Sequence, residues 1–198
     1  MPPDRPPITT FTGVVYRATT YDVPLWVSPN RRAGRWNRAG ADSTQYFCLD
    51  PEAPFAEMLR DEDLRTEHDA ATFRTVLWQL RVDEGAVVDY GTFDGAEAAG
   101  FDPAALVDDD HERCQIEAQR LKSLGVRGLL SPSAALPGSV TLTIFGPRAP
   151  IAWTTDVMLA SGIPVQRLAE GAAPSGLVER VRFYGDIHAG LHAHQQRR

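Results

Sequence analysis

The sequence has little cysteine and no long apolar run. Cys48 and Cys114 form neither a CxxC pair nor a metal-finger spacing. No apolar stretch approaches the roughly 18 residues that a membrane-spanning helix requires. No basic-then-apolar leader pattern stands at the N-terminus. We therefore expect a cytoplasmic protein with no membrane partner, in which both cysteines are reduced and buried.

Signatures of several common enzyme classes are also missing. The chain has no GxxxxGK phosphate loop, no GxGxxG after a strand, no GxSxG and no HExxH. These absences argue against the commonest scaffolds of nucleotide hydrolases, dehydrogenases, esterases and zinc proteases.

Lysine is nearly absent, and basic charge is in the minority. Lys122 is the only lysine among 20 basic residues, and the net charge is −6 with a pI near 5.3. An acidic chain is unsuited to binding nucleic acid non-specifically, so we expect no nucleic-acid partner for the protein by itself. The arginine bias is usual for GC-rich genomes, and it weakens any argument that one arginine was selected over lysine.

The size and composition fit one globular domain with a core: 198 residues, 43% hydrophobic and 23% charged. Apolar periodicity predicts a single α+β domain over residues 13–187, between an irregular arm (1–12) and a polar C-terminal tail (188–198). A long loop is expected at 21–42. Strands are expected at 13–20, 44–49, 73–83, 86–90, 126–130 and 139–145. Helices are expected at about 52–64 and 109–124, with two or three short elements in 146–187.

Two polar clusters have the composition of metal ligands but lack a supporting pattern. Asp108, Asp109 and Asp110 open the second predicted helix, where solvated carboxylates would match the helix dipole. His188 and His192 are four residues apart, as zinc ligands on a helix are, but no carboxylate or cysteine accompanies them in the tail. We therefore predict no metal site, and a frayed polar C-terminal end.

Several residues that suit catalysis or anion binding are dispersed along the chain. Taken singly, each has an ordinary interpretation, such as a strand arginine, a loop arginine or a serine in a turn. Glu57 stands out because it lies between the apolar pairs Phe55–Ala56 and Met58–Leu59. Such a carboxylate either faces water or lines a cavity. The dispersed candidates are Arg17, Arg35, Tyr46, Glu57, Ser131 and Ser133.

Four local motifs in order carry more information than these single residues. They are "YRA", "GRWNRAG", "YFCLDPEAPFAEM" and "GVRGLLSPSA" ahead of "LTIFGP". Together they resemble the RES-domain family, which includes the toxin partners of Xre-type antitoxins, over about residues 13–146. The resemblance implies an ADP-ribosyltransferase-like fold with a mixed or antiparallel sheet core and flanking helices.

The resemblance also implies a substrate and a site. The substrate is NAD, whose nicotinamide–ribose bond is cleaved, and no bound cofactor is expected. Glu57, Arg17 and Ser133 match the positions assigned to catalysis. Arg17, Arg35, Tyr46 and Ser133 match those assigned to NAD binding. These residues are expected to line one cleft.

The serine segment departs from the family pattern. Ser131 stands where an aromatic residue is common, so Ser131 could share or take the serine role. The arginine often found after the serine is replaced by "AAL". The missing arginine would take an anion contact away from that corner.

The residue types suit this chemistry, whereas the acceptor of the ADP-ribose group stays open. A carboxylate can stabilise the charge that develops on the ribose, arginine can bind a pyrophosphate, and an aromatic ring can stack on nicotinamide. NAD depletion by phosphorolysis or hydrolysis is the first hypothesis, with inorganic phosphate as a possible co-substrate. Mono-ADP-ribosylation of a cellular protein and a non-catalytic interaction module are the alternatives. The resemblance implies an Xre-type antitoxin as partner.

Overall fold

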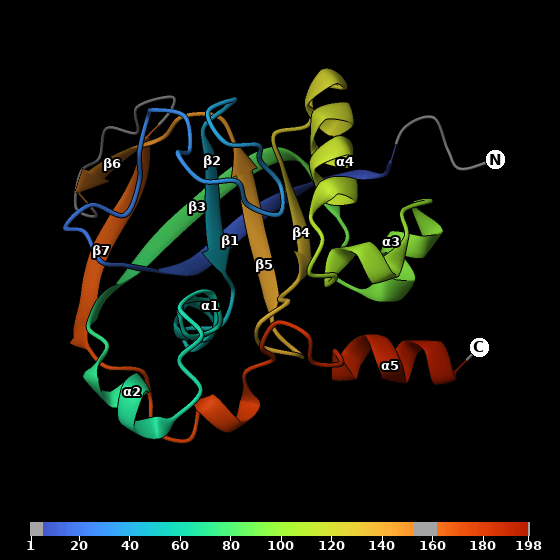
Figure 1. Cartoon of the computed structure of the whole chain (residues 1–198). Coiled ribbons are helices and arrows are strands. Elements are labelled where there is room, and N and C mark those ends of the chain that lie inside the picture. The colour runs from blue at the N-terminus through green and yellow to red at the C-terminus, as the bar shows by residue number, and fades with distance from the viewer. Residues whose placement is uncertain (1–5, 153–161, 198) are drawn as a thin grey trace.

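The computed structural model describes residues 6–152 and 162–197. Seven strands of these residues form one mixed sheet in the order β1-β2-β5-β4-β3-β7-β6 (Figure 1). Because β1 also pairs with β3, the first five strands of this order close into a ring. The strands are β1 (Ile8–Thr19), β2 (Thr44–Cys48), β3 (Thr75–Asp89), β4 (Gly128–Pro132), β5 (Val140–Phe145), β6 (Ala149–Ala152) and β7 (Gly162–Gly171).

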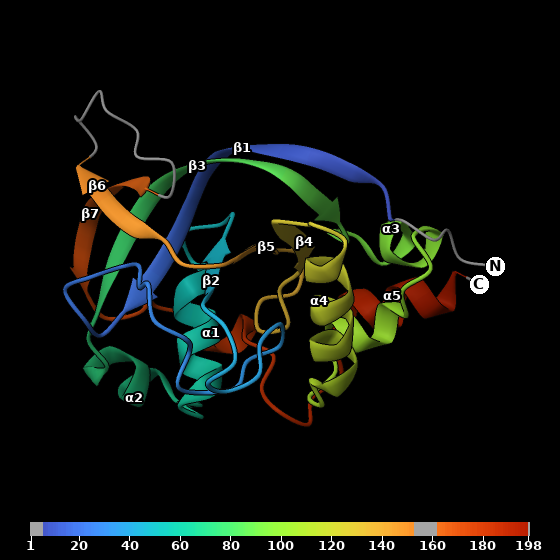
Figure 2. The same cartoon turned by 90° about the horizontal axis from the view of Figure 1, so that it is seen from above.

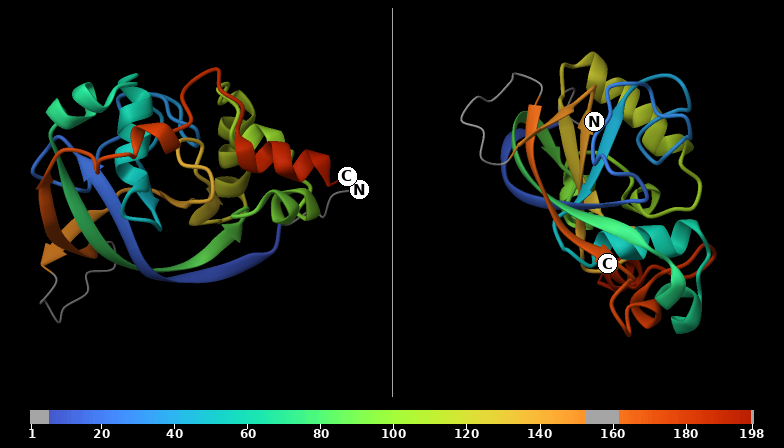
Figure 3. Two further views of the ribbon diagram at one scale, coloured as in Figure 1. Left: turned by 90° about the horizontal axis from the view of Figure 1, so that it is seen from below. Right: turned by 90° about the vertical axis from the view of Figure 1, so that its left-hand side faces the viewer.

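The helices lie mainly on one side of this sheet. The long strands β1 and β3 arch across the molecule, and α1, α2 and α4 lie on the inner side of the arch (Figures 2 and 3). None of the described helices is long and apolar enough to cross a bilayer. The helices are α1 (Ala53–Asp61), α2 (Glu67–Thr72), α3 (Phe93–Ala98), α4 (Glu112–Ser123) and α5 (Ala189–Gln196), with 3-10 turns at Pro103–Leu106 and Val178–Arg180. The single α+β domain with a mixed sheet is confirmed.

Strand β3 replaces the two strands predicted at 73–83 and 86–90. Val76, Trp78, Leu80 and Val82 are buried, as the period of two predicts, but Thr75 and Leu77 on the opposite face are buried too. The pairing with β1 shifts register opposite Gly85–Ala86, where Ala86 has a φ of 53°. This irregularity absorbs the predicted break, so the strand continues through it.

Helix α1 begins later than the sequence pattern suggested. Asp50 followed by Pro51 is a typical N-cap and first residue for the helix predicted at about 52–64. Instead the Asp50 carboxylate accepts a hydrogen bond from the Glu52 amide at 2.8 Å, and the helix starts at Ala53. Asp50 therefore caps a turn before the helix, and Pro54 occupies the first turn.

Helix α4 buries one apolar face and begins later than the predicted residue 109. Cys114, Ala118 and Leu121 are buried, and Gly125 follows the helix with a φ of 80°. The helix begins at Glu112 rather than 109, so the three aspartates lie in the preceding segment. They are therefore not residues of its first turn.

Both ends of the domain are more ordered than predicted. Residues 8–12 of the expected arm belong to β1, because they pair with the far end of β3; residues 1–5 lie outside the described part. The expected frayed tail forms α5, whose Leu191 packs against a core cluster. Cys48 and Cys114 are buried and free, as predicted.

Candidate functional site

A cavity with a volume of about 270 Å³ lies beside the β1–β2 pair. Within the described strands these two are paired at one position, Tyr16 with Cys48. The strands are therefore barely joined, and side chains of both face the cavity, together with residues of α1 and of the long loop. Its lining includes four of the five predicted site residues: Arg17, Arg35, Tyr46 and Glu57.

A tight turn places Arg35 and Tyr46 at the cavity. Gly34 and Asn37 exchange backbone hydrogen bonds of 3.0 and 3.4 Å, so Arg35 and Trp36 form the tip of the turn. The Tyr46 hydroxyl accepts from the Trp36 amide at 2.9 Å and donates to Asn37 Oδ1 at 2.7 Å. The hydroxyl is thus committed to the turn, and burial raises the pKa of Tyr46 above its usual range. The ring remains as the surface that Tyr46 offers to a ligand.

Gly34 is required by this close approach. A Cβ at position 34 would lie 2.8 Å from both Asn37 Oδ1 and the Tyr46 hydroxyl oxygen. We expect Gly34→Ala to lower the free energy of unfolding by about 1–3 kcal/mol, because the turn and Tyr46 must separate. Urea unfolding measures this. Gly85→Ala is the matched control, since a Cβ there meets no atom within 4 Å; equal stability of the two variants would contradict the role of Gly34.

Arg17 is buried at the cavity wall. Its side chain donates to Gln45 Oε1 at 3.1 Å, and its guanidinium lies 3.8 Å from the centre of the Trp26 ring. Burial lowers the pKa of Arg17 to about 9, which leaves the group charged at neutral pH. A cation held on an aromatic ring and an amide is oriented in advance for an anionic ligand.

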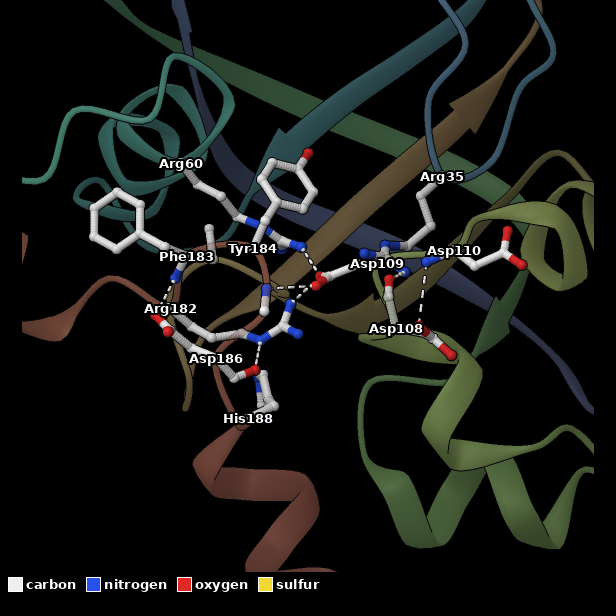
Figure 4. Close-up of polar contacts among 12 residues, drawn as sticks. Arg35, Arg60, Asp108, Asp109, Asp110, Arg182, Phe183, Tyr184, Asp186 and His188 are labelled. Carbon is white, nitrogen blue, oxygen red and sulfur yellow. Dashed lines mark hydrogen bonds and ion pairs between the residues drawn. The ribbon is translucent and has the colours of Figure 1, made fainter.

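Arg35 is held to the segment before α4. Its Nη1 donates to the carbonyl oxygens of Ala105 at 3.2 Å and Asp108 at 2.7 Å (Figure 4). Neither contact neutralises the guanidinium, because both acceptors are backbone carbonyls. The cavity therefore has a positive charge on the turn and another on β1.

Ser133 lies behind Glu57 rather than in the cavity wall. It is fully buried, and its hydroxyl donates to Glu57 Oε1 at 2.7 Å. The hydroxyl also accepts from the amides of Leu136 at 3.0 Å and Ala135 at 3.3 Å. The prediction that Ser133 lines the cleft is therefore wrong. Ser133 is not among the cavity residues, and it contacts the Glu57 carboxylate from behind.

Ser131 has a different environment. Its hydroxyl is buried on β4 and is 2.9 Å from the Thr141 hydroxyl on β5. Thr141, not Ser131, is among the cavity residues. Of the two candidate serines, Ser133 is the one that contacts Glu57.

Two further cavity residues were missed in the sequence. Asp61 follows Glu57 by one helical turn on α1, so the carboxylates share a face. Burial and the charge of Glu57 raise the pKa of Asp61, and Tyr184 donates to its carboxylate at 3.2 Å. Only the i, i+4 spacing could have signalled it. Cys48 also lines the cavity, and burial raises its thiol pKa well above the usual value, which disfavours a nucleophilic role.

The aspartates before α4 include an ion-pair centre that was not predicted. Asp109 Oδ1 is 2.6 Å from Arg60 and 2.7 Å from Arg182, and Asp109 Oδ2 accepts from the Gly185 amide at 2.7 Å (Figure 4). Burial acts to raise the pKa of Asp109, but these donors outweigh it and lower the pKa. The prediction of solvated charges is therefore wrong for Asp109. It joins α1 to the C-terminal segment.

No metal centre accompanies these groups. Residues 6–152 and 162–197 contain no group of three His, Cys, Asp or Glu side chains placed to hold a metal ion. His188, part of the zinc alternative, uses both ring nitrogens in contacts with Ser133 and Leu191.

The lowered pKa of His111 should make the stability of the fold depend on pH. Burial, Arg35 and Arg60 lower its pKa from 6.5 to about 4, so the folded protein holds it neutral. Between these values the unfolded chain binds the proton more strongly, and stability therefore falls as the pH drops through this window. We expect urea midpoints to decrease from pH 7 to pH 4.5, and His111→Gln to reduce that decrease. An unchanged pH dependence in the variant would contradict this assignment.

The site combines charges of both signs around an aromatic ring. Two guanidinium groups can bind an anionic group, the Tyr46 ring can stack on a flat one, and Glu57 can face a positive charge. A ligand that meets all three requirements is anionic in one part and cationic, or becoming cationic, in another.

Comparisons with known proteins follow this geometry. The family model described as "RES domain" matches residues 14–165. Among solved structures, a chain of the M. tuberculosis MbcT–MbcA toxin–antitoxin complex matches with a TM-score of 0.59 and 21% identity. That match covers 88% of this chain and 91% of the other. No significant match was found among curated proteins.

Proposed function

We propose, from the premise that the chain belongs to the RES domain family, that the protein binds NAD and cleaves its nicotinamide–ribose bond. The observation that carries the proposal is the placement of Glu57. This carboxylate is held by the Ser133 hydroxyl at 2.7 Å beside a cavity that Arg17, Arg35 and Tyr46 also line. NAD is the substrate, and no bound cofactor takes part.

The cavity volume suits the reacting half of NAD. Small-molecule pockets commonly measure about 300–1,000 Å³. This cavity, at about 270 Å³, is just below that range, so it suits a part of NAD rather than the whole molecule. The nicotinamide riboside portion would lie inside, with the Tyr46 ring against the nicotinamide. The pyrophosphate would meet the guanidinium groups of Arg17 and Arg35, each able to donate charge-assisted hydrogen bonds.

Bond cleavage in this arrangement needs no general acid. The nicotinamide of NAD is cationic, so it leaves as a neutral molecule when the bond from ribose C1′ to the ring nitrogen breaks and the electron pair stays on nitrogen. Positive charge then develops on the ribose, as in glycoside hydrolysis. The Glu57 carboxylate stabilises that charge, and the Ser133 hydroxyl keeps the carboxylate oriented. An oxygen of phosphate or water finally bonds to C1′, and a water acceptor releases its extra proton to solvent.

The acceptor determines the name of the reaction. Inorganic phosphate gives phosphorolysis and water gives hydrolysis, and both deplete NAD. A protein side chain gives mono-ADP-ribosylation instead. Incubation of the pure protein with NAD, with and without phosphate, followed by mass spectrometry, separates phosphorolysis from hydrolysis. ADP-ribose 1-phosphate formed only with phosphate indicates a phosphorylase, and free ADP-ribose indicates a glycohydrolase. Intact NAD under both conditions would overturn the proposal.

The biological role proposed for this activity is that of a toxin with an antitoxin partner, of the Xre type. An enzyme that depletes NAD must be restrained in the cell that makes it. The structural similarity to a chain from a toxin–antitoxin complex supports this role. Expression of the chain alone should arrest growth and lower cellular NAD. Normal growth with depleted NAD would count against the toxin role alone.

A further inference from the structure

The C-terminal segment 182–188 contacts the turn at residues 133–136, behind the candidate site. This segment lies beyond residues 14–165, which match the family model. The Arg182 amide donates to the Ala135 carbonyl at 2.8 Å, and His188 Nε2 lies 3.1 Å from the Ser133 carbonyl oxygen. Both contacts fall on the turn that presents the Ser133 hydroxyl to Glu57. The segment therefore contacts the turn whose Ser133 hydroxyl holds the Glu57 carboxylate.

The other side of this segment is fixed to α1 through a shared ion pair. Asp109 binds Arg182 and the Gly185 amide, and it also binds Arg60, which follows Glu57 by three residues on α1 (Figure 4). The segment and the helix that carries Glu57 are thus tied to the same carboxylate. Movement of the segment relative to α1 would break charged contacts that are partly buried.

The hydrogen-bond partners of His188 determine which ring nitrogen carries the proton. The Leu191 amide donates to His188 Nδ1 at 3.2 Å, so Nδ1 is an acceptor and the ring proton is on Nε2. Nε2 then donates to the Ser133 carbonyl. His188 is buried, and burial lowers its pKa, which favours this neutral form.

Ser133 connects the turn that His188 contacts to the Glu57 carboxylate. Its hydroxyl oxygen accepts from the amides of Leu136 and Ala135, which occupies both lone pairs. Its single hydrogen is directed at Glu57 Oε1. The orientation of the hydroxyl is therefore set by the 133–136 turn, and the turn is held from outside by His188.

We propose that His188 is a positioning residue for Glu57, acting through the backbone and hydroxyl of Ser133, so that the C-terminal segment is a working part of the active site. The kinetic consequence rests on the proposed NAD cleavage. His188 also caps α5, and the two roles can be separated because they use different ring nitrogens.

The test is a pair of substitutions at His188 and Ser133. His188→Asn keeps an acceptor near the Nδ1 position, and asparagine is among the best N-caps, but its amide is too short to reach the Ser133 carbonyl. We expect kcat for NAD cleavage to fall about tenfold with little change in KM, because Glu57 is displaced and binding groups are not. Ser133→Ala should lower kcat by about 100-fold.

A double-mutant cycle shows whether His188 acts through Ser133. In the Ser133→Ala background, His188→Asn should cause no further loss beyond about twofold. Thr66→Ala is the matched control, since it removes the N-cap of α2 and should lower the melting temperature without changing kcat. Unchanged kcat in His188→Asn, or losses that simply add in the double variant, would overturn the proposal.

A structural readout keeps this test apart from the proposed function. If the wild-type protein releases no nicotinamide, NAD cleavage fails, whatever His188 does. A crystal structure of the His188→Asn variant then decides the positioning role. A displaced Glu57 carboxylate supports it, and an unchanged contact between Ser133 and Glu57 overturns it.

Discussion

Replacement of Glu57 by glutamine should lower turnover by about 100- to 1,000-fold while NAD affinity changes little. Glutamine keeps the shape of the side chain, and its Oε1 can still accept the Ser133 hydroxyl that contacts Glu57 at 2.7 Å. What is lost is the negative charge that faces the developing ribose cation. Single-turnover and steady-state kinetics, with NAD binding measured by calorimetry, separate the two quantities.

Glu62→Gln is the matched control for this substitution. Glu62 follows the end of α1 and is exposed, so it reports on the loss of one carboxylate close to the same helix. It should leave turnover unchanged. Near-normal turnover in Glu57→Gln would remove Glu57 from the catalytic role, and an equal loss in both variants would point to net charge rather than to this site.

Replacement of Arg17 by alanine should instead weaken NAD binding by about 10- to 100-fold, equivalent to about 1.5–3 kcal/mol for hydrogen bonds to a charged group. A guanidinium that binds the pyrophosphate does so before and during bond cleavage, so KM rises more than kcat falls. The side chain is also packed on Trp26 and bonded to Gln45. Binding must therefore be measured well below the melting temperature of the variant.

Arg81→Ala is the control for Arg17→Ala, because Arg81 lies exposed on the neighbouring strand β3. It should leave NAD affinity within about twofold of the wild type. A large fall in kcat with unchanged affinity in Arg17→Ala would assign Arg17 to the transition state. A similar loss of binding in Glu57→Gln would mean that both residues only hold the substrate.

The sequence predicted the regular parts of the fold and missed the parts set by tertiary contacts. The period of two in β3 and the apolar face of α4 are local patterns, and both are present. The arm at 8–12 became strand because β3 is long enough to pair with it. Residues 189–196 became helix because His188 caps them and Leu191 packs on the core. Neither partner can be read from the local sequence.

The motifs predicted candidate residues that share one cleft, but they did not predict where Ser133 lies. Arg17, Arg35, Tyr46 and Glu57 are far apart in sequence but line one cavity. The position of Ser133 behind Glu57 depends on how β4 turns after Pro132, which the spacing does not reveal.

Three further residues near the site lie outside the motifs altogether. The i, i+4 partner Asp61 was visible in the sequence but was not singled out. Asp109 contacts Arg60 and Arg182, and His188 contacts Ser133; these partners are distant in sequence, so only the folded chain connects Asp109 and His188 to the site.

The most direct test of the central claim is the number of nicotinamide molecules that the pure protein releases at saturating NAD. The account predicts many turnovers per protein molecule, with nicotinamide formed in equal amount to the NAD consumed. It also predicts that release nearly stops in Glu57→Gln. Binding of NAD without any release of nicotinamide would contradict the account and leave a binding module in place of an enzyme.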